Sequence, residues 1–412
     1  MKFIILGKFS FNHIYFLLYA LFTITREILN KYLNENNKNI SQYFYLMYIT
    51  ILSRFLAIIP HLINKRLSKR IKEESEENTN EKGIYYIYND KSDEFSKKLF
   101  ISTLKVSIFE FLGQALLCIF YFFNDKPEVT SYYSLQIYLI FNTITQYFVS
   151  YLVLNFQFYK HHYLSLGINL FCIFIFLIID IIEIVNQKIS VYQFYIYIFM
   201  RLVKLLLYAF EDNYAKQVLY TEFISSFTLM FLMAIYETVM ILIFSIPFIF
   251  LKTKDSGETI FVDFVEYLKG KKLILSIIIF ICSFLYEMFL LIIIDRFSPS
   301  HLPFGFILHS LFSNIYKIIE NSSNNNESKY FLYINFIFYI ILFIGAMIHN
   351  EIFIINKCGF NKNTKLFLDY KLKEERNNSE IDEDEDEDNA FDNQNTITSE
   401  RDIPLQNIVG NK

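Results

Sequence analysis

Apolar residues are grouped along this chain in long stretches, most of them separated by short polar connections. We place ten such stretches at roughly residues 9–30, 43–64, 99–123, 132–155, 163–185, 191–210, 222–251, 273–295, 301–319 and 330–349. A helix that crosses a hydrocarbon core about 30 Å thick needs about 20 residues of this kind. We therefore predict an all-α membrane protein with ten transmembrane helices. The stretch at 301–319 is the weakest, because Pro303 and Gly305 interrupt its beginning.

The composition supports this prediction. Of the 412 residues, 54% are hydrophobic and 19% are charged, against about 25% charged residues in soluble domains. The charges gather between the apolar stretches and near the C-terminus, where residues 382–388 alternate Asp and Glu. Residues 378–412 are polar and acidic, so we predict a disordered tail there. Cys118, Cys172 and Cys282 lie inside apolar stretches and are expected to serve packing.

The basic residues predict the orientation of the chain in the membrane. Positively charged loops favour the cytosol, and Lys and Arg are concentrated in residues 65–72 and again in residues 357–373. With ten helices, loop 65–98 and the C-terminus lie on the same side, so both termini are expected in the cytosol. The lysines of residues 252–272 oppose this assignment, because this orientation places them outside.

Ten helices divide into two sets of five. We predict a first repeat at residues 9–185, which includes loop 65–98, and a second repeat at residues 191–350, followed by the tail at 378–412. A repeat with an odd number of helices enters the membrane from the opposite side in its second copy. Such inverted repeats place a binding site near the membrane midplane and allow alternating access.

Polar residues inside the apolar stretches are the candidates for that binding site, because a charge in hydrocarbon costs about 2.5–3.5 kcal/mol. Several of them are three or four residues apart and so share a helix face. The candidates for substrate binding or gating are Glu110, Gln114, Asn142, Gln146, Arg201, Lys204, Glu237, Glu287, His309 and Asn314.

Most of these residues also have a structural interpretation. Asn142 and Gln146 could hydrogen-bond between helices, and Glu110 could pair with Arg201 or Lys204. Glu237 and Glu287 could be buried in a neutral form. A further set near the helix ends is expected to extend its charges toward water: Arg26, Glu27, Arg54, Asp180 and Asp295.

Four segments resemble the drug/metabolite transporter superfamily, most closely the F subfamily of solute carrier family 35. They are Leu52–Arg66, Phe109–Gln114, Tyr208–Lys216 with Ala234–Thr238, and Gly345–Ile352. The chain departs from the family pattern at four positions: Thr238 replaces a glycine, Ser226 stands where proline is common, and Glu110 and Gln114 stand where the family usually has Asp and Thr. The resemblance implies a ten-helix carrier. It also implies an endomembrane location (Golgi, endosomal or lysosomal/vacuolar), with the plasma membrane left open.

Together these observations predict a multi-pass solute transporter that works by alternating access. The resemblance implies a nucleotide sugar or a related small anionic metabolite as cargo, with Arg201 and Lys204 attracting phosphate. The alternative is a non-transporting membrane adaptor that recruits partners through loop 65–98 and the tail.

The expected partners are the lipid bilayer and a small-molecule solute, with no nucleic acid. The sequence does not indicate an oligomeric state. We predict no enzyme activity and no cofactor, since no catalytic triad or phosphate-binding glycine loop is visible. No metal site is predicted either, because the pair His161 and His162 has no Cys or carboxylate at ligand spacing.

Overall fold

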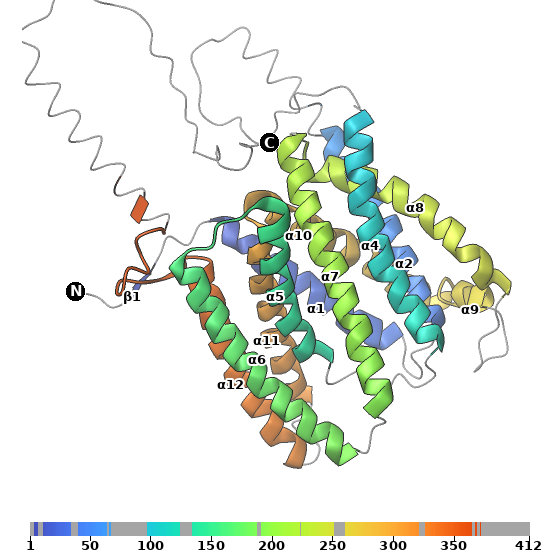
Figure 1. The fold of residues 1–412 in the computed structure, drawn as a ribbon. Helices are drawn as coiled ribbons and strands as arrows, with labels where there is room; N and C mark the ends of the chain where they lie inside the picture. The colour runs from blue at the N-terminus through green and yellow to red at the C-terminus, as the bar shows by residue number, and fades with distance from the viewer. Residues whose placement is uncertain are drawn as a thin grey trace, which may run out of the picture.

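The protein folds into a bundle of long α-helices, shown here in a computed structural model (Figure 1). The structure describes residues 4–6, 11–33, 40–63, 66, 97–123, 134–187, 191–222, 224–250, 260–320, 326–364, 367–368 and 371. The predicted tail at 378–412 and nearly all of loop 65–98 lie outside these residues. Each of the ten predicted stretches is helical over most of its described part, which confirms the all-α class.

The long helices are α1 (Ile14–Leu33), α2 (Ile40–Ser53), α4 (Lys97–Phe123), α5 (Ser134–Leu154), α6 (Lys160–Gln187), α7 (Val191–Thr221), α8 (Ser226–Phe250), α10 (Gly270–Arg296), α11 (Leu302–Glu320) and α12 (Asn326–His349). Shorter pieces are the 3₁₀ turns η1 (Phe11–His13), η2 (Arg54–Ala57) and η4 (Pro299–His301), and the helix α9 (Ile260–Glu266). Residues 58–63 continue as α-helix after η2.

One element was not predicted from the sequence. Strand β1 (Ile4–Leu6) pairs antiparallel with β2 (Phe353–Ile355), with Ile4 opposite Ile355. Each strand has only three residues, too few for an alternating pattern to be recognised. The pair joins the segment before α1 to the segment after α12.

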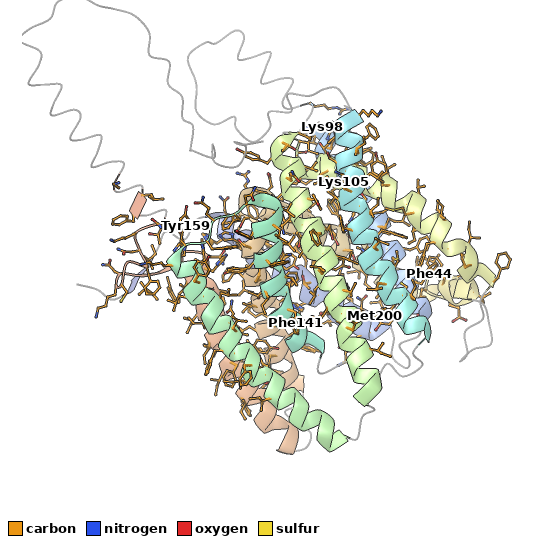
Figure 2. All side chains as sticks on the ribbon, in the orientation of Figure 1. Phe44, Lys98, Lys105, Phe141, Tyr159 and Met200 are labelled. Atoms are coloured by element: carbon orange, nitrogen blue, oxygen red, sulfur yellow. The ribbon has the colours of Figure 1, made fainter. Side chains whose placement is uncertain are left out.

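Helices distant in sequence form the largest contacts. Helix α1 packs on α10 and α11, and α4 packs on α7 and α8. Helix α5 packs on α7 and α6, while α12 packs on α11 and α6. Side chains fill the space between these helices (Figure 2). The main core lies where α1, α10 and α11 meet: Phe16 lies edge-on to Phe304, and Phe22 stacks on Phe289.

Two glycines permit close helix approach in this bundle. A Cβ atom on Gly113 of α4 would lie 2.6 Å from the ring of Tyr208 on α7. A Cβ atom on Gly305 of α11 would lie 2.9 Å from the ring of Tyr19 on α1. Gly305 interrupts an apolar stretch in the sequence, but in the fold its lack of a side chain makes room for an aromatic ring.

Four helical segments are long and apolar enough to cross a membrane: Tyr43–Ile63, Lys97–Leu116, Ser226–Pro247 and Gly270–Arg296. Large apolar side chains are exposed on outer faces, among them Phe171 and Phe174 of α6 and Ile243 of α8. Charged residues are buried inside, including Arg54 and Glu237. An apolar exterior around charged groups is the arrangement that a bilayer requires. The chain is therefore an integral, multi-pass membrane protein.

Candidate functional site

Arg54 lies at the centre of the bundle because α2 tightens into the 3₁₀ turn η2 at this residue. A short 3₁₀ segment within a longer helix often marks strain or a hinge. The turn directs the guanidinium inward, where only 1% of the residue is exposed. The prediction that Arg54 extends toward water at a helix end is therefore wrong. Arg54 lies midway along the predicted stretch at 43–64, and the helix continues beyond it to residue 63.

Three buried glutamates surround the Arg54 guanidinium. Glu110 of α4 contacts both Nη atoms, and Glu237 of α8 lies 2.6 Å and 2.8 Å from Nη1. Glu287 of α10 lies 2.9 Å from Nη2. Burying one side of such a network without the other is strongly unfavourable. We call these ion pairs the Arg54 cluster. They hold α4, α8 and α10 against α2 and its continuation η2.

This arrangement corrects the pairing of Glu110 that was drawn from the sequence. Glu110 pairs with Arg54 and not with Arg201 or Lys204. Glu237 and Glu287 are buried, as their structural interpretation expected, and each contacts the Arg54 guanidinium. The amide of Gln114, one turn along α4, donates a 2.9 Å hydrogen bond to Glu110.

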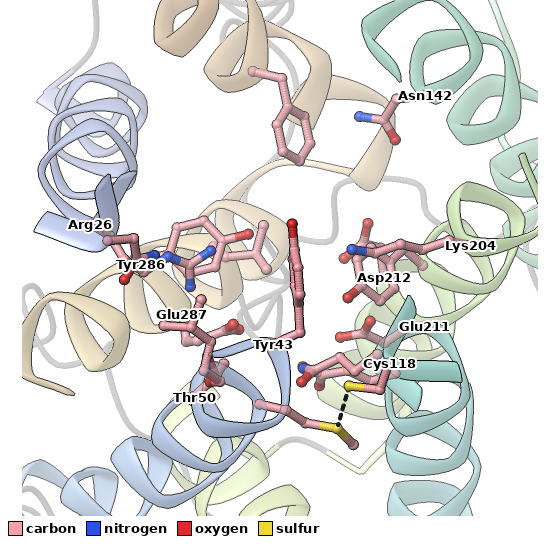
Figure 3. Close-up of a pocket in the computed structure, with 18 residues that line it drawn as sticks. Arg26, Tyr43, Thr50, Cys118, Asn142, Lys204, Glu211, Asp212, Tyr286 and Glu287 are labelled. Carbon is pink, nitrogen blue, oxygen red and sulfur yellow. Dashed lines mark hydrogen bonds between the residues drawn. The ribbon is translucent and has the colours of Figure 1, made fainter. Parts of the chain in front are cut away.

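A cavity of about 280 Å³ lies beside the Arg54 cluster. Figure 3 shows charged side chains on both sides of it, with Arg26 and Glu287 facing Lys204 and Asp212. Its lining residues come from both halves of the chain: Arg26, Asn30, Tyr43, Leu46, Met47, Thr50, Glu110, Gln114, Cys118, Asn142, Lys204, Tyr208, Glu211, Asp212, Tyr286, Glu287, Leu290 and Phe306.

Two further carboxylates line the cavity from α7. Glu211 and Asp212 are both 6% exposed. Asp212 accepts a hydrogen bond from the Gln146 amide, and Gln146 in turn accepts one of 3.3 Å from Asn213. This chain of amides orients Asp212, and it explains why Gln146 is buried behind the cavity wall.

The two cations of the cavity each lie over an aromatic ring. The Arg26 guanidinium is 4.3 Å from the centre of the Tyr286 ring, and the Lys204 ammonium is 4.8 Å from that of Tyr208. A cation over an aromatic face gains about 0.5–2 kcal/mol, more when water is excluded. Arg26 was expected to reach out to water, but the structure places it in the cavity wall.

Five of the ten predicted site residues line the cavity: Glu110, Gln114, Asn142, Lys204 and Glu287. Glu237 and Gln146 support it through the contacts described above. Three others lie elsewhere. His309 is 3.0 Å from Glu27, Asn314 is buried in α11, and Arg201 is absent from the cavity wall.

The sequence analysis missed four charged members of the site: Arg26, Arg54, Glu211 and Asp212. Arg26 and Arg54 were assigned to helix ends, and Glu211 and Asp212 fall just after the stretch drawn at 191–210. Helix α7 continues to Thr221, so both acids lie within it. The adjacent Glu211-Asp212 in an otherwise apolar region was the signal that could have found them.

A second buried polar cluster gathers five of the seven histidines. The rings of His161 and His162 are 4.0 Å apart, and those of His162 and His349 are 4.6 Å apart. His301 lies 4.8 Å from His349, and Phe297 separates it from His13. We call this the histidine cluster. It lies where α6 begins, near the position of Tyr159 in Figure 2.

The histidine cluster favours neutral rings. Burial lowers the pKa of His161 to about 4. Burial, together with the neighbouring His161 and His301, lowers the pKa of His162 to about 2. The backbone amide of Tyr159 donates a 3.0 Å hydrogen bond to His162 Nδ1, which occupies the lone pair that a second proton would need.

Among the described residues, no group of three His, Cys, Asp or Glu side chains is placed to hold a metal ion. His161 Nε2 lies 3.5 Å from a carboxylate oxygen of Glu351. Cys118, Cys172 and Cys282 are buried free thiols, as their positions in apolar stretches predicted.

No protein-family model matches this chain, and no curated protein matches it either. The resemblance to the drug/metabolite transporter superfamily therefore stays a prediction from the segments quoted above.

Proposed function

We propose that this protein is a membrane solute carrier that works by alternating access, with the cavity as its solute site. The observation that carries the proposal is a charged cavity inside a bundle of membrane-spanning helices, lined from both halves of the chain. Charged groups in such an environment are costly and typically belong to transport pathways.

The pattern of helix contacts supports two inverted repeats of five helices, at residues 9–185 and 191–350. Equivalent helices under this division are α1 and α7, α2 and α8, α4 and α10, α5 and α11, and α6 and α12. The contacts of α4 with α7 and α8 then correspond to those of α10 with α1 and α2. Likewise, α5 on α7 and α6 corresponds to α11 on α1 and α12.

The charged residues of the site also come from equivalent helices of the two repeats. Glu110 and Glu287 come from the equivalent helices α4 and α10, and Arg54 and Glu237 come from the second helix of each half. Arg26 of α1 and Lys204 of α7 form a further equivalent pair of cations. A site at a repeat interface is the arrangement expected of rocking carriers.

This proposal includes the ten-helix topology with both termini in the cytosol, and an endomembrane location. It also includes the nucleotide-sugar class as a prediction from the resemblance. Lys204 lines the wall, but Arg201 does not, and four carboxylates share that wall. The adaptor alternative depends on loop 65–98 and residues 378–412, most of which lie outside the described residues.

Thiol labelling tests the alternating-access mechanism. Cys118 lines the cavity, with its Sγ 3.8 Å from Met47 Sδ. A variant that keeps only this thiol (Cys172→Ala, Cys282→Ala, Cys358→Ser) is reconstituted in vesicles and treated with a membrane-impermeant methanethiosulfonate from one side or the other. We expect slow labelling from both sides, because each side gains access in turn. Labelling from one side only contradicts the mechanism.

The matched control retains only Cys358, the exposed thiol in the segment after β2. That thiol should react quickly from a single side, which also reports the orientation of the protein in the vesicle. Deleting residues 378–412 separates the two candidate functions, because a carrier should keep both-sided labelling of Cys118 and an adaptor should lose partner recruitment.

A further inference from the structure

Glu211 differs from the other carboxylates of the cavity because, within the part of the chain that the structure describes, it has no hydrogen-bond or ion-pair contact. Each glutamate of the Arg54 cluster faces the guanidinium, and Asp212 accepts a hydrogen bond from Gln146. Among the described residues, no donor lies within hydrogen-bonding distance of the Glu211 carboxylate, and no Lys or Arg nitrogen pairs with it. The residue is only 6% exposed and lines the cavity.

An ionised carboxylate that is buried without a partner is strongly unfavourable. In Figure 3 the Glu211 side chain extends into the cavity, on the side of Lys204 and Asp212. The Lys204 ammonium lies over the Tyr208 ring, 4.8 Å from its centroid, and forms no ion pair with the Glu211 carboxylate within 4 Å among the described residues. The position therefore favours a positively charged group supplied from the cavity itself.

The charge balance of the site points in the same direction. The cavity wall carries four carboxylates, Glu110, Glu211, Asp212 and Glu287, against the two cations Arg26 and Lys204. Adding Arg54 and Glu237 from behind the wall gives five carboxylates against three cations.

The equivalence of the two halves identifies where the excess arises. Helix α1 contributes Arg26 and Asn30 to the cavity, but no carboxylate. Its counterpart α7 contributes Lys204 together with Glu211 and Asp212. The acidic pair is therefore an addition to an otherwise balanced site, and neither acid is needed to neutralise Arg54.

The uncharged residues of the cavity wall indicate which chemical groups a ligand could place against them. Tyr43, Tyr208, Tyr286 and Phe306 provide aromatic faces, and Leu46 and Leu290 provide apolar ones. Aromatic faces bind cationic and apolar groups alike. A volume of about 280 Å³ is at or below the lower end of the range for small-molecule sites, roughly 300–1,000 Å³, so the occupant is small.

We propose that the cargo is a small organic cation, an amine that is protonated at neutral pH and carries a compact aromatic or apolar body, with Glu211 as the counter-ion of its ammonium group. This inference rests on the carrier function proposed above. It disfavours a phosphorylated cargo, whose charge would meet four carboxylates, while both cations of the wall are already placed over aromatic rings.

Binding to the full-length protein in lipid nanodiscs tests the assignment. The probes are tyramine and choline as cations, 4-ethylphenol as the uncharged counterpart of tyramine, and uridine monophosphate as a phosphorylated anion. We expect the two cations to bind, and 4-ethylphenol to bind at least tenfold more weakly than tyramine. Glu211→Gln should weaken tyramine binding at least tenfold. The control Glu266→Gln, at an exposed residue outside the cavity, should leave it unchanged.

The Glu211→Gln protein could fail to fold, so a second measurement uses a protein that retains Glu211. In the variant that keeps only Cys118, tyramine should slow labelling of this cavity thiol, and 4-ethylphenol should not. Absence of cation binding, binding of uridine monophosphate alone, or equal tyramine affinity in a folded Glu211→Gln protein would each overturn the proposal. The last result would mean that Glu211 holds a proton and no cargo.

Uptake measurements distinguish a failure of the proposed carrier function from a failure of the proposed cation site. Cation binding without uptake into proteoliposomes contradicts transport but leaves the cation site in place. Uptake of uridine monophosphate without cation binding supports transport and rejects the cation.

Discussion

The Arg54 cluster and the histidine cluster are both buried, polar and formed by helices from both halves of the chain, yet they meet the cost of burial in opposite ways. Arg54 keeps its charge and is surrounded by three carboxylates. Among the described residues, the histidines are not surrounded by acids in this way: His161 has the one carboxylate contact with Glu351, and burial lowers the pKa values of His161 and His162. One cluster depends on compensation between charges, and the other depends on the absence of charge. Each should therefore fail under a different perturbation.

Removing the central charge should have the largest effect. Arg54→Met leaves Glu110, Glu237 and Glu287 buried without their cation, and we expect a loss of about 3–5 kcal/mol in stability. Thermal unfolding in detergent, followed by size-exclusion fluorescence, measures it. Arg296→Met, at an exposed residue of α10, is the control and should change little.

Partial rescue would sharpen this result. Adding Glu110→Gln and Glu287→Gln to Arg54→Met removes two of the uncompensated charges, so stability should return in part. If Arg54→Met alone unfolds no more readily than the control, the ion pairs do not hold the helices together.

Acidification should instead act on the histidine cluster. An unfolded histidine has a pKa near 6.5, whereas burial lowers that of His161 to about 4. Between these values the unfolded chain binds a proton that the folded chain does not, so stability falls as the pH falls. The expected slope is about 1.4 kcal/mol per pH unit for each such histidine.

Unfolding measured at several pH values from 7 to 5 checks this dependence. His161→Gln should reduce the slope, because one of the titrating rings is gone. An unchanged slope in this variant would show that the acid sensitivity arises elsewhere, and the comparison between the two clusters would then lose its basis.

A smaller effect is expected from the hydrogen bond that closes the histidine cluster. The Tyr147 hydroxyl bonds to Nδ1 of His349, while its ring stacks on Phe158 at 4.7 Å. Tyr147→Phe keeps the stacking and leaves one buried nitrogen without its partner, at a cost of about 1–3 kcal/mol. The exposed Tyr163→Phe is the matched control. Equal stability of the two variants would contradict the contact.

The sequence predicts the helices well, because a bilayer imposes a length and a polarity that composition reveals directly. It predicts five of the eighteen residues that line the cavity, and most of these are acids or amides in the middle of apolar stretches, as Glu110 and Glu287 are. It fails for Arg54, because position along a helix does not tell which way a long side chain points. It also fails for Glu211, because the predicted apolar stretch ends at residue 210, whereas α7 continues to Thr221.

The histidine cluster marks a different limit. His13, His161, His301 and His349 are far apart along the chain, and each lies at the end of a helix or in a turn. Only the packing of α6 against α12, with η1 and η4 beside them, brings their rings together. The spacing of these histidines along the sequence therefore does not predict that their rings come together.

The ion pairs around Arg54 also restrict how this protein can change over generations. One arginine serves three glutamates on three helices, so replacing it alone leaves three negative charges uncompensated. Losing a single glutamate is milder, since two remain beside the guanidinium. Substitutions should therefore accumulate at the glutamates first, and Arg54 should change only in a sequence that has already lost at least two of them. Related chains should show this as a fixed order of replacement, with the arginine last.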